Sequence, residues 1–141
     1  MKRRTKGREA ALRVLYQLDL TRDPPEEILR EFWEESPLGA EVRSFAEQLV
    51  RGVIDQRAHL DSLINEVSAH WSVDRMSVID RNILRIAIFE LMCMADIPPK
   101  VSINEAIELA KVYGAKESPA FINGILDPVS KDLLDARAGE A

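Results

Sequence analysis

The residues from Val78 to Ala95, VIDRNILRIAIFELMCMA, constrain the fold of this chain more than any other stretch of its sequence. Apolar side chains occupy so many of these positions that they surround most of a helix with about 3.6 residues per turn. A surface helix would confine its apolar residues to one stripe. We therefore expect a central helix that other elements cover on several sides.

The few charged residues of this central stretch gather on one edge. Arg81 and Arg85 are four residues apart and share a helical face, with Asp80 beside them. Because unpaired buried charges are costly, this edge should either reach the surface or find oppositely charged partners. Two interpretations remain open, a solvated edge of a core helix and a docking edge for another protein.

Helical periodicity extends over most of the chain, and no alternating pattern of useful length predicts a strand. About seven helical segments with short connections predict an all-α bundle that forms a single domain over residues 1–141. One long segment runs to about Arg57, and the spacing from Leu60 to Trp71 predicts another. The order of the segments suggests two sub-bundles, at about residues 8–70 and 71–135.

Several residues predict where the helices begin, end or approach one another. Ser102 and Glu105 have the spacing of a capping box at a helix start, and Gly114 is expected to end the same helix. Gly52 lies within a helical segment, where it would permit close helix approach. Pro128 is expected to bend or break the last helix.

The composition excludes several classes of protein. Cys93 is the single cysteine, so the chain has no disulfide framework or cysteine-rich metal site, and its place in an apolar run suggests an unreactive core thiol. No apolar stretch reaches the roughly 20 residues of a membrane span, and no secretory signal is present. No glycine-rich phosphate loop or nucleophile motif suggests an enzyme. We expect a soluble cytoplasmic protein without cofactor or metal.

The net charge of −5 hides a strong asymmetry. Residues 1–13 contain six basic side chains against one acidic side chain, a balance of +5, which leaves −10 for the rest of the chain. Residues 1–7 show no apolar periodicity, so we expect them to form a flexible basic arm. A basic arm on an acidic body is typical of nucleic-acid contact, although short basic starts also occur in ordinary soluble proteins.

Three strings together resemble NusB-type transcription antitermination factors. They are REAALRVLYQLDL at 8–20, DRNILRIAIFEL at 80–91 and PPKVSINEAIELAKVYGAKESPAFINGILD at 98–127. The resemblance covers essentially the whole chain and is weakest in residues 21–70. It implies two packed three-helix sub-bundles and a non-enzymatic RNA-binding factor. Such factors pair with NusE, a small-subunit ribosomal protein, bind boxA RNA in nascent ribosomal transcripts, and join other Nus factors on RNA polymerase.

The resemblance also implies functional residues at matching positions. The family's arginine-rich arm corresponds to Arg3, Arg4, Lys6 and Arg8, although Thr5 and Gly7 interrupt the basic run. Arginines there would neutralise phosphates and stack on unpaired bases. Lys111 and Lys116 either extend the RNA path or are ordinary solvated lysines.

The family's partner surface corresponds to Tyr16 and Asp80, with Arg85 nearby, and this favours a docking edge on the central helix. Asn104 and Asn123, which lie in the resembling strings, are expected to have structural roles.

Two other functions remain under consideration. The chain resembles the NusB-like module of some RNA cytosine methyltransferases, but it ends near Ala141 without a catalytic domain. A homodimer that hides the basic arm would act as an inactive store, and the acidic body and basic arm are compatible with this self-pairing.

Overall fold

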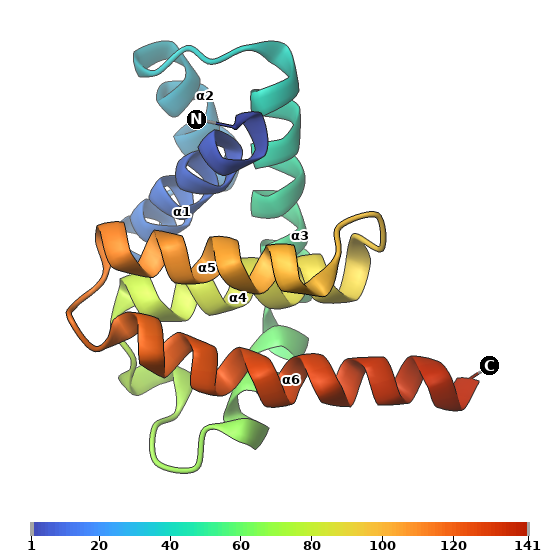
Figure 1. Cartoon of the computed structure of the whole chain (residues 1–141). Helices are drawn as coiled ribbons and strands as arrows, with labels where there is room; N and C mark the ends of the chain where they lie inside the picture. The colour runs from blue at the N-terminus through green and yellow to red at the C-terminus, as the bar shows by residue number, and fades with distance from the viewer. Residues whose placement is uncertain (1, 141) are drawn as a thin grey trace.

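The computed structural model describes residues 2–140, and within that range the chain is helical without a strand (Figure 1). The prediction of an all-α fold is therefore confirmed. The helices are α1 (Arg3–Thr21), α2 (Pro25–Glu35), α3 (Ala40–Val67), α4 (Val78–Cys93), α5 (Pro99–Tyr113) and α6 (Ser118–Glu140), with a 3₁₀ turn at Val73–Arg75. Residues 2–140 thus contain six α-helices where the sequence suggested about seven.

The difference in helix number arises in α3. The two segments expected before and after residue 58 form one continuous helix of 28 residues. This helix ends at Val67, because the Ser68 hydroxyl then donates to the Trp71 carbonyl at 2.6 Å and Asn65 accepts from the Val73 amide at 2.9 Å. Such side-chain bonds compete with the helical ladder. Trp71, expected on a buried helical face, lies outside the helix with 53% of its surface exposed.

Helix α4 forms the centre of the fold, as the sequence predicted. It contacts α1, α3, α5 and α6, and the side chains of Ile83, Leu84 and Ile88 are fully buried. Gly52 of α3 permits one of these contacts, because a Cβ atom there would lie only 2.1 Å from the Phe89 ring. The close approach predicted at Gly52 is therefore confirmed.

The helices fall roughly into the two expected groups. Figure 1 shows α4, α5 and α6 running side by side, while α1 and α3 cross them at a steep angle. Helix α1 packs on α2 and α3, but α1 and α3 also pack on α4. The buried apolar residues of both groups accordingly form one continuous core.

The helix boundaries agree in part with the local sequence signals. Gly114 ends α5, as expected. The capping-box prediction is wrong, because α5 already begins at Pro99 and Ser102 lies buried inside it. Helix α6 continues through Pro128, where the sequence predicted a bend or break. Pro128 has no N–H to donate to the carbonyl of Gly124, four residues earlier in the helix. Gly124 is exposed, so water can bind that carbonyl instead. In residues 2–140, none of the helices combines the length and the apolar character needed to span a membrane.

Candidate nucleic-acid interface

Three exposed cations, Arg3, Arg4 and Lys6, lie in the first two turns of α1. The sequence predicted a flexible arm over residues 1–7, but the chain is helical from Arg3 onward. Arg3 pairs with Glu41 of α3, and Arg4 Nη2 lies 3.1 Å from Asp96 Oδ2 in the connection between α4 and α5. Met1 lies outside the described residues.

The ring of Phe45 in α3 packs against the start of α1. The guanidinium of Arg4 lies 5.1 Å from the centre of the Phe45 ring, and that of Arg8 lies 5.4 Å from it. These are cation–π distances. Gly7 packs on the same ring, where a Cβ atom would come within 2.7 Å of Phe45 Cδ2. Gly7 therefore brings the helix close to α3 and does not interrupt it.

Arg8 does not belong to the exposed cations, which corrects its assignment to an RNA-binding arm. Only 2% of its side chain is exposed, and it is paired with acidic residues of α4 and α5. Arg8 Nε donates to Glu90 Oε2 at 2.9 Å and Nη2 to Oε1 at 2.6 Å, while Nη1 donates to Glu105 Oε1 at 3.1 Å. The bidentate contact with Glu90 is the strong geometry for an arginine and a carboxylate.

Two hydroxyl groups complete this buried group. Ser102 Oγ donates to Glu90 Oε1 at 3.0 Å, and Thr5 Oγ1 donates to Glu105 Oε1 at 2.6 Å. Ser102 and Glu105 thus bond residues of other helices, which explains why they do not form a capping box. The Arg8 cluster is defined by Thr5, Arg8, Glu90, Ser102 and Glu105.

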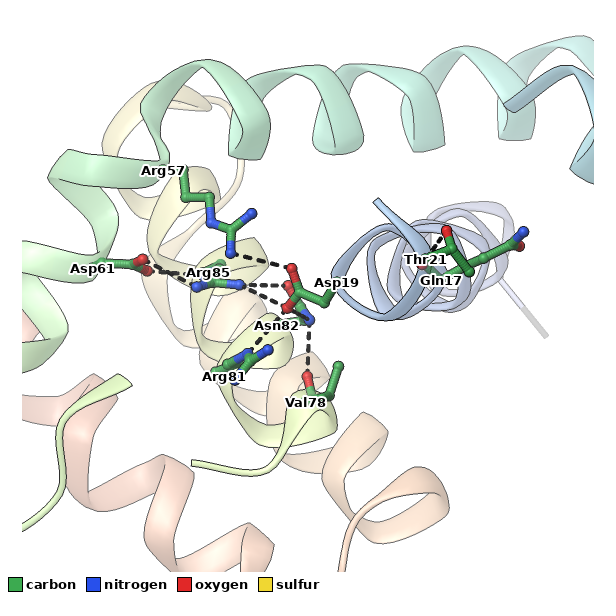
Figure 2. A network of polar contacts seen from close by, with 9 residues as sticks. All are labelled: Gln17, Asp19, Thr21, Arg57, Asp61, Val78, Arg81, Asn82 and Arg85. Carbon is green, nitrogen blue, oxygen red and sulfur yellow. Dashed lines mark hydrogen bonds and ion pairs between the residues drawn. The ribbon is translucent and has the colours of Figure 1, made fainter. Parts of the chain in front are cut away.

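A second polar group lies near the other end of α1, around Asp19 (Figure 2). Asp19 Oδ2 accepts from Arg81, Asn82 and Arg85 at 3.0 to 3.1 Å, and Oδ1 lies 3.2 Å from Arg57 Nη2. The Asp19 cluster is defined by Asp19, Arg57, Asp61, Arg81, Asn82 and Arg85.

The Asp19 carboxylate is ionised in spite of its burial. Burial by itself would raise the pKa of Asp19. The hydrogen bonds from Asn82 and Arg81 and the charges of Arg85 and Arg57 outweigh that effect and hold the pKa below its usual value.

Arg85 belongs to this cluster and not to an exposed partner surface, which corrects the prediction. Its side chain is 2% exposed, and its Nε and Nη2 donate to the two carboxylate oxygens of Asp61 at 2.8 and 3.0 Å. The charged edge of the central helix has therefore found internal partners. Neither a solvated edge nor a docking edge describes Arg85, whereas Asp80 in the first turn of α4 remains partly accessible.

The other two predicted partner residues lie at neighbouring hollows of the surface. Tyr16, 39% exposed, lines an apolar groove with Leu20, Phe32 and Ile79. Asp80, the next residue after Ile79, lines a hollow beside the exposed Trp71. Among the described residues, none donates a hydrogen bond to the buried Oδ1 of Asp80. An unsatisfied buried acceptor is costly, whereas the Asp80 residue as a whole stays partly accessible beside this hollow.

The remaining residues singled out in the sequence lie apart from these groups. Lys111 is exposed and pairs with Glu108 at 3.0 Å, and Lys116 is exposed in the connection between α5 and α6. Lys111 follows Glu105 by six residues, or about 9 Å along α5. Asn123 is exposed, which gives no support to its expected structural role.

Cys93 is exposed at the end of α4, so the prediction of a core thiol is wrong. Cys93 is the last residue of α4, where the chain turns toward α5. Within residues 2–140, no group of three or more His, Cys, Asp or Glu side chains is placed to hold a metal ion.

The spacing of two acidic residues, Asp19 and Glu90, is a sequence signal for both clusters, although neither residue was predicted to have a functional role. Asp19 follows Ala11 and Leu15 at intervals of four, and Glu90 follows Ile83 and Ile86 at helical spacing. Each acidic residue therefore occupies a position of a buried stripe. A charge at such a position predicts a buried partner on another helix, but the pattern does not identify that partner.

Comparisons with known proteins identify the family of this chain. The model of the NusB family matches residues 5–131. A transcription antitermination protein NusB from Anaeromyxobacter dehalogenans is 50% identical over 139 residues, which cover 98% of this chain and 97% of that protein. NusB of T. maritima superposes with a TM-score of 0.85 at 39% identity, covering 93% of this chain and 92% of that one.

A further structural match comes from the crystal structure of antitermination factors NusB and NusE in complex with double-stranded RNA. A chain of that complex superposes with a TM-score of 0.85 at 29% identity. The match covers 94% of this chain and 98% of that chain.

Proposed function

Because the chain belongs to the NusB family, we propose that it is a non-enzymatic, RNA-binding factor of transcription antitermination. The observation that carries this proposal is its similarity, over nearly its whole length, to a chain of the complex of NusB and NusE with double-stranded RNA. The exposed cations at the start of α1 supply a surface of the required charge. In this role the protein acts in the cytoplasm as a binding module without cofactor.

The proposed RNA surface consists of Arg3, Arg4 and Lys6. These side chains lie within two turns of one helix, on a ridge that Phe45 and the Arg8 cluster support. Arginine and lysine neutralise phosphates and release their counterions, so the affinity should fall as the salt concentration rises. Lys111 and Lys116 extend this surface if the RNA follows α5. Arg8 contributes by supporting α1 and makes no contact with RNA.

The proposed protein partner is NusE, the ribosomal protein, bound at Tyr16 and Asp80. Tyr16 offers an aromatic side chain at the edge of an apolar groove, and Asp80 offers a partly accessible carboxylate at a neighbouring hollow. An apolar contact next to a specific polar contact is typical of protein interfaces. The pair would then bind boxA RNA and join other Nus factors on RNA polymerase.

Binding of a boxA RNA and of a scrambled RNA of equal length, with and without NusE and at two salt concentrations, tests this proposal. We expect NusE to raise the affinity for the boxA RNA much more than that for the scrambled RNA. Sedimentation at the same concentrations controls for self-association. Equal weak binding of both RNAs, with no response to NusE, would contradict the proposed function.

A further inference from the structure

Two carboxylates from outside α1 occupy the arginines at its start. Glu41, in the first turn of α3, pairs with Arg3, and Asp96, between α4 and α5, pairs with Arg4. Among the described residues, no carboxylate forms a comparable ion pair with Lys6. The candidate RNA surface therefore has two of its three cations already paired with acidic groups.

A carboxylate and a phosphate bind a guanidinium through the same N–H groups. RNA that approaches Arg3 or Arg4 must therefore replace the carboxylate or share the arginine with it. Replacement exchanges one charged contact for another, so it gains less free energy than a phosphate would gain at an unpaired arginine. Phosphate contacts carry no direct sequence information, and the loss falls on the part of the affinity that every RNA shares.

We infer that Glu41 and Asp96 restrain the affinity of the proposed RNA surface by competing with RNA phosphates for Arg3 and Arg4. They lower its affinity for RNA of any sequence, so that stable binding depends on base contacts and on the protein partner. This inference rests on the proposed function and deepens it.

The geometry allows the exchange to occur. The side chains of Glu41 and Asp96 are 75% and 64% exposed, and exposed ion pairs are weak enough for a phosphate to replace them. Arg4 keeps a second contact with the ring of Phe45, which would hold its guanidinium at the surface after Asp96 is released.

The test uses Glu41→Gln, Asp96→Asn and the double variant of the full chain, titrated with boxA and scrambled RNA. We expect each single variant to bind the scrambled RNA about threefold tighter, and the double variant about tenfold tighter, as loss of weak exposed pairs implies. The affinity should also depend more steeply on salt. Because phosphate contacts are common to all RNAs, we expect a gain of similar size for boxA RNA, so that binding to every RNA rises.

Glu26→Gln is the matched control. It makes the same change in net charge and releases Arg51 from an exposed pair between α2 and α3, outside the proposed RNA surface. An equal gain in this control would show a general charge effect and overturn the inference. Unchanged or weaker binding by Glu41→Gln and Asp96→Asn would overturn it as well.

Arg4→Ala in the same titration separates this inference from the proposed function. If Arg4→Ala weakens RNA binding while Asp96→Asn leaves it unchanged, only the role of the carboxylates is rejected. If the unmodified chain and every variant fail to bind either RNA, both the inference and the proposed function are rejected.

Discussion

Helix α1 carries one buried charge near each of its ends, and the two charges have opposite signs. Near its start, Arg8 binds Glu90 of α4 and Glu105 of α5. Near its end, Asp19 binds arginines of α4 and α3, as Figure 2 shows. Both clusters join α1 to α4 and to one further helix. One cluster lies under the candidate RNA surface, and the other lies close to the candidate partner surface.

The two clusters differ in how well water can solvate a charge that has lost its partner. In the Arg8 cluster a single cation serves two carboxylates, and only 1% of the Glu90 side chain is exposed. In the Asp19 cluster three guanidiniums surround two carboxylates, and 52% of the Arg57 side chain is exposed. Removal of Arg8 therefore leaves the buried carboxylate of Glu90 without a cation. After removal of Asp19, Arg57 can turn to solvent and Arg85 keeps its contact with Asp61. The number of partners and their access to water decide how costly each loss is.

Arg8→Met is expected to have the largest effect of the variants that test this comparison. It leaves Glu90 buried without a cation, and breaking a buried pair from one side costs about 3–5 kcal/mol. Urea unfolding followed by circular dichroism measures the loss. Arg51→Met, which removes an arginine from an exposed pair with Glu26, is the control and should cost less than about 1 kcal/mol.

The double variant Arg8→Met, Glu90→Leu sharpens this test. Replacement of both buried charges by apolar side chains is often close to neutral, so the double variant should regain most of the lost free energy of unfolding. If the double variant is less stable than Arg8→Met alone, stranded charge is not the cause of the loss.

Asp19→Asn is expected to cost less, about 1–3 kcal/mol, which is the scale of hydrogen bonds to charged groups. The asparagine retains one acceptor for the surrounding donors, Arg85 keeps its bidentate contact with Asp61, and Arg57 can reach water. Urea unfolding of this variant beside Arg8→Met gives the ranking directly. A loss as large as that of Arg8→Met would show that the Asp19 cluster is as closed as the Arg8 cluster.

The effect of Asp19→Asn should also depend on pH. The pKa of Asp19 is lower in the folded protein than in the unfolded chain. Its carboxylate therefore stabilises the fold above the unfolded pKa of about 4, and this contribution disappears as the pH falls through the folded pKa. We expect the difference in stability between the protein and Asp19→Asn to be full at pH 7 and to shrink under acid. If the difference in stability instead grows as the pH falls, the pKa of Asp19 is raised in the folded protein and not lowered.

The sequence predicted the elements of the fold better than their polar contacts. The dense apolar pattern of residues 78–95 predicted a central helix, and α4 is that helix. The pattern could not predict that α3 is continuous up to Val67, because the helix end depends on bonds made by Asn65 and Ser68.

The two clusters were missed for a related reason. Arg8 lies in the second turn of α1, and Asp19 lies in its last turn, where the dipole of that helix disfavours a negative charge. Each charge instead contacts the opposite end of α4, where the dipole of the neighbouring helix favours it. Local rules consider one helix at a time and left the charged edge with Arg85 open, and the resemblance to the family then implied an RNA-binding arm for Arg8 and a partner surface near Arg85. Only the packing of α1 against α4 shows that both arginines are interior.

Asp80→Ala should give the smallest change in stability and isolates the partner surface from the nearby Asp19 cluster. The substitution removes a buried oxygen without a donor, a gain that offsets the loss of an acidic residue in the first turn of α4. The free energy of unfolding should therefore change by less than about 1 kcal/mol. Urea unfolding measures this change.

NusE binding, measured by calorimetry, should nevertheless weaken about tenfold if a donor from the partner binds the Asp80 carboxylate, since unpairing such a donor costs about 1–3 kcal/mol. Asp74→Ala, an exposed position of the neighbouring 3₁₀ turn, is the control and should leave the affinity unchanged. Unaltered NusE binding by Asp80→Ala would remove Asp80 from the proposed partner surface.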